Sequence, residues 1–292
     1  MITPPYLSEG SKIAIVAPAR KVTYDEISYA VEYIRGRGYI PVYDERLFLS
    51  YNQFAGTDDE RAAVLQYYLD SDDIDAILCV RGGYGTVRII DRLNFDKFIK
   101  IPKWVIGYSD ATVLHAKLQS IGVESIHATM PINFHNNTKK SLDSLFEVLQ
   151  GKDVKYDIMD SPYNKEGFVE AEIVGGNISV LYSLLDSGIF PNTDGKVLFL
   201  EDLDEYLYHV DRMMIALKRA GKLDNIVGLI VGGLTDMHDN SIPFGMTAED
   251  IILEKVSEMN IPVCFNFPAG HIEDNQAIVL GRKFKLSVFS KH

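Results

Sequence analysis

Short apolar runs that alternate with segments of helical spacing constrain the fold of this chain more than any other sequence feature. Strand-like runs occur at 12–17, 40–43, 74–80, 103–107 and 124–130, and helical spacing occurs between them at 25–35, 58–69 and after residue 109. Such alternation predicts a parallel sheet with helices on both faces. Ligands of these sheets bind beyond the carboxyl ends of the strands.

The second half of the chain has a different pattern. Residues 151–167 are rich in Asp, Ser, Pro, Asn and Gly, and we interpret them as a linker. The sequence therefore predicts a doubly wound α/β domain at 1–150 and a mixed β/α domain at 168–292. We expect more antiparallel pairing in the second domain, whose runs at 277–280 and 284–288 resemble a hairpin.

Charge and composition narrow the class of partner. The 292 residues carry a formal net charge of −12 and are 47% hydrophobic, which favours a globular protein and argues against nucleic acid or an anionic membrane as a partner. We see no signal peptide and no membrane-spanning run, so we expect a cytoplasmic protein. Cys79 and Cys264 lie in apolar runs and are expected to be buried, reduced thiols.

One serine stands at the end of an apolar run. The segment 103–107 ends at Gly107, Ser109 follows, and Asp110 and Thr112 suit the first turn of a helix. A serine on such a strand-to-helix turn lies beside backbone N–H groups, as in a nucleophile elbow. The G-x-S-x-G pattern is not met, because Ala111 takes the place of the last glycine. The alternative is that Ser109 only caps the helix.

A glycine-rich segment, Arg81-Gly82-Gly83-Tyr84-Gly85, follows another strand-like run. Glycines allow backbone N–H groups to approach a ligand closely, but the same residues also make a tight turn. The spacing fits neither a dinucleotide-binding motif nor a phosphate loop.

A nucleophilic serine needs a base and a group that orients the base. His271 follows an apolar run and Ala-Gly, and Glu201 follows the run 197–200, so both are placed at strand ends. His115 lies on the helix after Ser109 and is expected to pack locally. The alternatives are an exposed loop histidine and a solvated acidic segment.

Five motifs occur together in one order along the chain. They are Arg81-Gly82-Gly83-Tyr84-Gly85, Gly107-Tyr108-Ser109-Asp110, Gly175-Gly176-Asn177, Leu200-Glu201-Asp202 with Asp211-Arg212-Met213, and Ala269-Gly270-His271 with Gly281. Together they resemble the serine L,D-carboxypeptidases (muramoyltetrapeptide carboxypeptidases) of bacterial cell-wall recycling, a family that also contains the microcin C self-immunity peptidases. One departure is that no glycine follows His127.

The resemblance implies roles for particular residues. It implies a triad of Ser109, His271 and Glu201 at the interface of the two domains, and an oxyanion hole from the N–H groups of Gly83 and Asp110. The resemblance and the glycine-rich segment also predict contacts with substrate at Arg81, Gly82 and Tyr84, although Arg81 equally suits a structural tie to the turn. We expect no cofactor and no metal, and the family expectation is a homodimer.

The predicted reaction is hydrolysis of the L,D peptide bond that holds the terminal D-alanine of a murein tetrapeptide, so the expected partner is a small muropeptide. Two alternatives remain. One is a peptidase that cleaves a peptidyl or aminoacyl nucleotide antibiotic of the microcin C type, and the other is a non-catalytic α/β protein that binds a small peptide.

Overall fold

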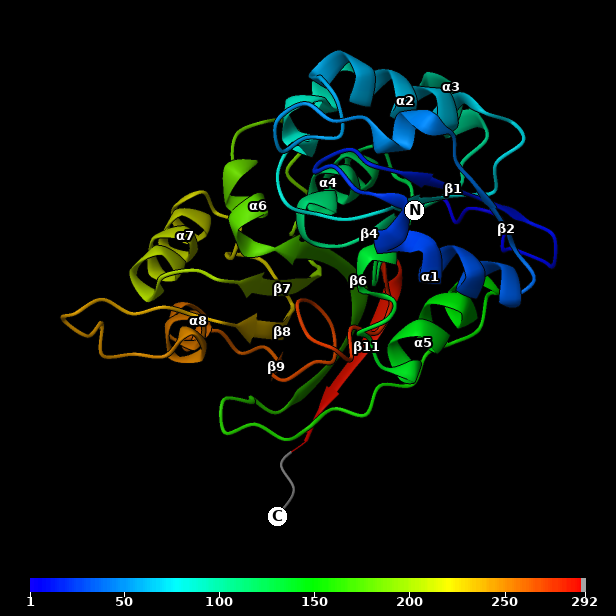
Figure 1. Cartoon of the computed structure of the whole chain (residues 1–292). Coiled ribbons are helices and arrows are strands. Elements are labelled where there is room, and N and C mark those ends of the chain that lie inside the picture. The colour runs from blue at the N-terminus through cyan, green and yellow to red at the C-terminus, as the bar shows by residue number, and fades with distance from the viewer. Residues whose placement is uncertain (290–292) are drawn as a thin grey trace.

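The computed structural model describes residues 1–289 and contains two β-sheets, each flanked by helices (Figure 1). In the first sheet the strand order is β10 (Ile278–Leu280), β5 (Ser125–His127), β4 (Trp104–Gly107), β3 (Ala76–Cys79), β1 (Lys12–Val16) and β2 (Ile40–Val42). All neighbouring strands are parallel except β10 and β5, which are antiparallel.

Helices cover both faces of the first sheet. The helices are α1 (Tyr24–Gly36) and α5 (Lys139–Leu149) on one face, and α2 (Asp58–Asp70), α3 (Asp96–Lys100) and α4 (Thr112–Ser120) on the other (Figure 1). Successive residues of β1 alternate between the two cores, with Ile13 and Ile15 in one and Ala14 and Val16 in the other. Burial on both faces explains why these strands are continuously apolar.

Short 3-10 turns supply several of the connections. They are η1 (Glu45–Phe48), η2 (Thr86–Arg88), η3 (Ile90–Arg92), η4 (Ser109–Ala111) and η5 (Pro131–Asn133). Val87 lies in η2 and Ile90 in η3, so this stretch forms two short turns and not one helix. Thr57 and Glu60 form a capping box at the start of α2.

The second sheet has the order β11 (Lys283–Val288), β6 (Gly167–Asn177), β7 (Val197–Leu203), β8 (Gly228–Thr235) and β9 (Val263–Cys264). One face is covered by α6 (Ile178–Ser183), α7 (Leu207–Arg219) and α8 (Ala248–Val256). The predicted class, a doubly wound α/β unit followed by a mixed β/α unit, is confirmed. The expectation of more antiparallel pairing in the second half is wrong, because each sheet has a single antiparallel pair.

The end of the chain crosses between the sheets. The predicted hairpin of 277–280 with 284–288 is wrong, since β10 pairs with β5 in the first sheet and β11 pairs with β6 in the second. The pattern of burial gives the reason: all three residues of β10 are buried, whereas β11 has exposed positions. Residues 152–164 contain no helix or strand. The domain bounds at 150 and 168 stay a prediction.

Two further expectations concern the thiols and the membrane. Cys79 and Cys264 are free and buried, and burial raises the pKa of the Cys79 thiol to about 12 and that of Cys264 to about 11. Within residues 1–289, every helix is too short or too polar to cross a membrane.

Candidate active site

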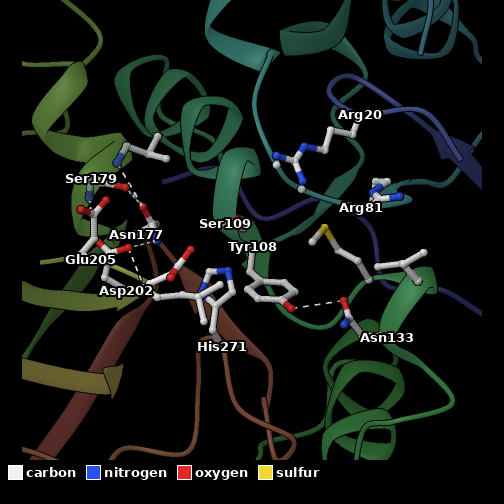
Figure 2. Close-up of a pocket in the computed structure, with 17 residues that line it drawn as sticks. Arg20, Arg81, Tyr108, Ser109, Asn133, Asn177, Ser179, Asp202, Glu205 and His271 are labelled. Carbon is white, nitrogen blue, oxygen red and sulfur yellow. Dashed lines mark hydrogen bonds between the residues drawn. The ribbon is translucent and has the colours of Figure 1, made fainter. Parts of the chain in front are cut away.

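A cavity of about 470 Å³ lies where the two halves meet (Figure 2). Its lining comes from both sheets: Arg20, Arg81, Gly82, Gly83, Tyr108, Ser109, Met130, Ile132, Asn133, Asn177, Ser179, Val180, Asp202, Leu203, Asp204, Glu205 and His271. The carboxyl ends of β3, β4, β6 and β7 all contribute to it. This is the position at which sheets of this kind bind ligands.

Ser109 stands on a strained turn. It follows β4 directly and has a φ of 62°, a left-handed conformation that residues with a side chain rarely adopt. Such strain costs on the order of 1–3 kcal/mol and concentrates at functional sites. The geometry fits a nucleophile elbow rather than a simple cap, because Ser109 is not the N-cap of η4 or α4 and its side chain lines the cavity.

His115 forms a hydrogen bond to the chain just before this turn and does not line the cavity. Its Nε2 donates to the Gly107 carbonyl at 2.8 Å, and its Nδ1 accepts from the Ser125 hydroxyl at 2.8 Å. Burial lowers the pKa of His115 to about 3, so the ring is neutral. The expectation that His115 packs locally agrees with these contacts.

The glycine-rich segment lies against Ser109. A side chain at Gly82 would meet the Ser109 Oγ at 2.8 Å and lie 3.5 Å from the Asp110 nitrogen. Gly83 has a φ of 112°, and in the described chain its N–H pairs with no acceptor. The absence of a side chain at 82 therefore lets this segment lie against Ser109, and the Gly83 and Asp110 N–H groups are the candidate donors to an oxyanion. The side chain of Asp110 is buried and accepts from the Thr86 N–H at 2.9 Å.

His271 and Glu201 form a hydrogen-bonded pair. Glu201 Oε2 accepts from His271 Nδ1 at 2.6 Å and from the His271 backbone N–H at 3.2 Å. Gly270, with a φ of 104°, makes this contact feasible, because a Cβ at this position would lie 2.8 Å from Glu201 Oε2. Because Nδ1 is hydrogen-bonded to the Glu201 carboxylate, Nε2 is the ring nitrogen that remains for proton transfer.

Burial and mutual attraction oppose each other in this pair. Burial by itself raises the pKa of Glu201, but the charge of His271 and the hydrogen bonds outweigh it and hold the pKa well below its usual range. Burial likewise lowers the pKa of His271, while the Glu201 charge and hydrogen bond raise it by more. The pair thus favours a charged carboxylate that orients the imidazole and stabilises its protonated form.

The sequence predicts that Glu201 directly follows its strand, but the structure places Glu201 inside β7. Strand β7 continues to Leu203, and a register shift against β8 lies between Leu200 and Asp202. Bulges of this kind redirect side chains next to active sites. Here the bulge accompanies a fully buried Glu201 that contacts His271, followed by Asp202, which lines the cavity.

His127 completes the surroundings of Glu201 from the first half of the chain. This buried residue at the end of β5 has its Nε2 3.9 Å from Glu201 Oε1. Within residues 1–289, neither His127 ring nitrogen nor Glu201 Oε1 has a hydrogen-bond partner. The sequence placed His127 beside a strand and gave no signal for this contact, which joins positions 74 residues apart.

Ser109 and His271 line the same cavity, and the Tyr108 ring packs against the His271 ring with centroids 4.8 Å apart (Figure 2). The described side chains show no hydrogen bond between Ser109 Oγ and His271. Hydrogen bonds of catalytic groups commonly tighten only in the complex with substrate.

The remaining predicted residues divide into two groups. Arg81 lines the cavity but also donates to the Lys21 carbonyl at 3.1 Å and lies 3.5 Å from Glu26, in keeping with a structural tie. Tyr84 is not part of the cavity lining and packs on Phe54 with centroids 6.2 Å apart, because the chain turns away after Gly83.

Sequence reasoning missed Asp202, which lies on the opposite wall of the cavity from the glycine-rich segment. Its carboxylate accepts from Asn177 Nδ2 and from the Ser179 N–H, both at 2.9 Å. Burial and the neighbouring Glu201 charge raise the pKa of Asp202 to about 7. The acidic residues after 200 were visible in the sequence, but their separate environments were not.

Two family descriptions match most of the sequence. The LD-carboxypeptidase N-terminal domain matches residues 13–128, and the LD-carboxypeptidase C-terminal domain matches residues 170–286. The chain belongs to the LD-carboxypeptidase family. The motif resemblance is thereby confirmed, and the chain is a carboxypeptidase of this family by descent.

Individual relatives agree with the family. A probable murein peptide carboxypeptidase of Bacillus subtilis (strain 168) is 32% identical over 99% of this chain and 92% of its own length. The crystal structure of muramoyltetrapeptide carboxypeptidase from Oxalobacter formigenes superimposes with a TM-score of 0.85 at 26% identity, covering 96% of each chain. The microcin C7 self-immunity protein MccF of Escherichia coli is 22% identical over 94% of this chain and 89% of its own.

Proposed function

We propose that this protein is a serine carboxypeptidase that releases the terminal D-alanine of murein tetrapeptides by hydrolysing the L,D peptide bond. One observation supports this proposal more strongly than the others. The buried Glu201–His271 pair, from the second half of the chain, opens on the same cavity as the strained Ser109 from the first half. The murein peptide carboxypeptidases among the relatives support the substrate class.

In the first half-reaction His271 Nε2 takes the proton of the Ser109 hydroxyl while Oγ forms a bond to the scissile carbonyl carbon. The carbonyl electron pair moves onto oxygen, which the N–H groups of Gly83 and Asp110 stabilise. When the carbon–nitrogen bond breaks, its electron pair stays on the nitrogen of D-alanine. That nitrogen takes the proton from His271 Nε2, and D-alanine leaves.

In the second half-reaction water attacks the acyl-enzyme. His271 Nε2 takes a proton from the water, and the tetrahedral intermediate again directs its oxyanion toward the two backbone amides. The carbon–Oγ bond then breaks, Oγ regains the proton from Nε2, and the shortened peptide leaves with a new carboxylate. Glu201 stays ionised throughout and holds Nδ1–H of the imidazole.

The rest of the proposal concerns the setting of the reaction. We propose that the enzyme needs no cofactor, that it works in the cytoplasm on small muropeptides, and that it forms a homodimer. Light scattering coupled to size-exclusion chromatography tests the dimer, for which a mass near 33 kDa would contradict the proposal.

A second candidate follows from the similarity to MccF of Escherichia coli. In this alternative the same serine chemistry cleaves a peptidyl or aminoacyl nucleotide antibiotic. Stacking of a base would call for an aromatic ring with a free face at the cavity. The Tyr108 ring lines the cavity but packs against the His271 ring with centroids 4.8 Å apart, and the single tryptophan, Trp104, is fully buried in β4. The murein peptide is therefore the substrate that we favour.

Mass spectrometry of the products decides between these substrates. The purified protein is incubated separately with a murein tripeptide, tetrapeptide and pentapeptide and with an aminoacyl sulfamoyl adenosine. We expect D-alanine and tripeptide from the tetrapeptide, and turnover of the nucleotide alone would establish the alternative.

The variant Ser109→Ala supplies the control. We expect it to reduce turnover by at least about 10⁴-fold, because the covalent route is lost, while the far-UV circular dichroism stays unchanged. Full activity of this variant would reject the nucleophile.

A further inference from the structure

Two arginines, Arg20 and Arg81, line the candidate active site on the same side of the cavity (Figure 2). A protein with a net charge of −12 needs a local cation to hold an anionic substrate. The two guanidinium groups differ in what they contact.

Arg81 is held by the protein itself. Its guanidinium donates to the Lys21 carbonyl at 3.1 Å and lies 3.5 Å from the Glu26 carboxylate. These contacts compensate part of its charge and fix it in one geometry. The resemblance made Arg81 a candidate for substrate contact, but its contacts serve the turn between β3 and η2.

The Arg20 guanidinium has no such partner. In the described residues 1–289, its side chain forms no hydrogen bond and no ion pair, although it lies at a cavity wall. The backbone below it is fixed by a β-bridge between Arg20 and Phe54 and by the Ala55 N–H, which donates to the Ala19 carbonyl at 3.1 Å. The backbone of Arg20 is thus held in place, while its side chain keeps all five N–H donors available.

Two adjacent glycines limit the separation between Arg20 and the nucleophile. A Cβ at Gly83 would lie 2.7 Å from Arg20 Nε, and a Cβ at the adjoining Gly82 would lie 2.8 Å from Ser109 Oγ. Neighbouring Cα atoms are about 3.8 Å apart, so Nε lies within roughly 12 Å of the serine hydroxyl. Gly83, which carries the proposed oxyanion donor, separates the two groups.

The substrate of an exopeptidase imposes a matching limit. Three bonds separate the scissile carbonyl carbon from the terminal carboxylate carbon, which places them within about 4 Å of each other. The attacked carbon lies about 3 Å from Oγ, so the carboxylate lies within about 7 Å of the serine. A guanidinium donates to a carboxylate at about 2.8 Å, and this brings the carboxylate within reach of Arg20.

We propose that Arg20 binds the free terminal carboxylate of the substrate and thereby makes the enzyme an exopeptidase. This inference rests on the proposed function, which supplies a peptide with a terminal D-alanine. The planar guanidinium takes the carboxylate in two parallel hydrogen bonds, and this places the scissile carbonyl between Ser109 and the Gly83 amide.

The test compares the murein tetrapeptide with the same peptide bearing a C-terminal amide. We expect the wild-type protein to prefer the free acid in kcat/KM by about 10- to 100-fold, the range of a charged hydrogen bond. In Arg20→Gln we expect kcat/KM for the acid to fall by that factor, while kcat/KM for the amide stays within about two-fold. Arg20→Lys keeps the charge and loses the planar fork, so its loss is intermediate.

Lys21→Gln is the matched control, because it removes the same charge from the next residue, whose Nζ contacts Ser50 Oγ at 3.2 Å and is absent from the cavity lining. Its preference for the acid should equal that of the wild type. If the wild type cleaves the tetrapeptide but Arg20→Gln keeps the same preference for the acid, the inference on Arg20 is overturned and the proposed function stands. If the wild type cleaves neither peptide, both are overturned.

Discussion

The two walls of the cavity hold their chemistry by different means. The N-terminal wall, formed by Arg81–Gly83 and Ser109, depends on backbone conformation: Ser109 and Gly83 have positive φ, and Gly82 leaves space for the serine side chain. The C-terminal wall, formed by Glu201, Asp202 and His271, depends on buried charge, since the two acids are at most 1% exposed.

Substitutions should therefore act differently on the two walls. A change in volume beside Ser109 displaces the nucleophile, whose position depends on backbone conformation and not on a neighbouring charge. At the C-terminal wall a change in charge without a change in volume removes the orienting carboxylate or alters titration. Four substitutions should reveal this contrast, with effects that decrease from Glu201→Gln to Asp202→Asn.

Glu201→Gln should have the largest effect, because it preserves shape and removes charge. The neutral amide no longer stabilises protonated His271 and permits the wrong tautomer, and kcat should fall by about 10⁴-fold. Steady-state kinetics on the tetrapeptide measures this. Glu254→Gln removes the charge of an exposed carboxylate that pairs with Lys255 on α8. It is the control for a loss of one negative charge outside the site. A near-native rate for Glu201→Gln would show that the C-terminal wall does not act through charge.

Gly82→Ala tests the N-terminal wall, because it adds volume and no charge. The new Cβ would lie 2.8 Å from Ser109 Oγ, and the displaced hydroxyl should lower kcat by about 10²-fold, as misplacement by about 1 Å does. Gly36→Ala adds the same methyl where no atom lies within 4 Å and should leave kcat unchanged. Equal kinetics for the two variants would contradict the role of space at this wall.

His127→Gln tests whether the second wall needs support from the first half. The His127 Nε2 atom lies 3.9 Å from Glu201 Oε1, and its loss leaves that oxygen with a less favourable neighbour. We expect kcat to fall by about 10-fold, in line with the cost of an uncompensated buried polar group. We also expect the acidic limb of the pH–rate profile to move, which a purely structural role for His127 would not produce. An unchanged profile would refute the positioning role.

Asp202→Asn should have the smallest effect, and it concerns stability. In the folded protein the pKa of Asp202 is raised to about 7, so the native state binds this proton more tightly than the unfolded chain. Its stabilising contribution is complete below about pH 4 and is lost as the pH rises through about 7. The free energy of unfolding of the wild type should therefore decrease between pH 5 and pH 8 by about 2–3 kcal/mol more than that of the variant.

Urea denaturation at the two pH values measures this difference. Asp204→Asn changes an exposed carboxylate two residues away and should keep the wild-type dependence on pH. The same pH dependence in Asp202→Asn as in the wild type would contradict the role of Asp202.

The N-terminal wall was accessible from the sequence because its geometry is local. Gly107, Ser109 and the glycines at 82 and 83 lie next to the strands that place them, and turn residues have specific conformational preferences. The assignment of His271 and Glu201 needed motif resemblance, since nothing local joins residues 70 positions apart. Their contact in the structure agrees with that assignment, while their catalytic roles stay predictions.

What the sequence could not provide depends on pairing at a distance. The bulge at Glu201 is defined by the register of β7 on β8, and the approach of His127 depends on how the two sheets face each other. The sequence also could not predict that β10 pairs with β5, because two short apolar runs separated by a turn are typical of a hairpin. No sequence pattern points to Arg20, because its proposed role depends on a guanidinium that has no hydrogen-bond or ion-pair partner in the described residues. That property depends on the fold of the whole site.

Strand β10 has a consequence for how the protein is made. Its three residues cover the edge of the first sheet beside β5, yet they are synthesised more than 100 residues after β5. A nascent chain that has emerged only through the first five strands therefore exposes the backbone of β5 as an open edge. The nucleophile-bearing half reaches its final form only after β10 has left the ribosome, so translation products that stop before β10 should be prone to aggregation and without hydrolytic activity.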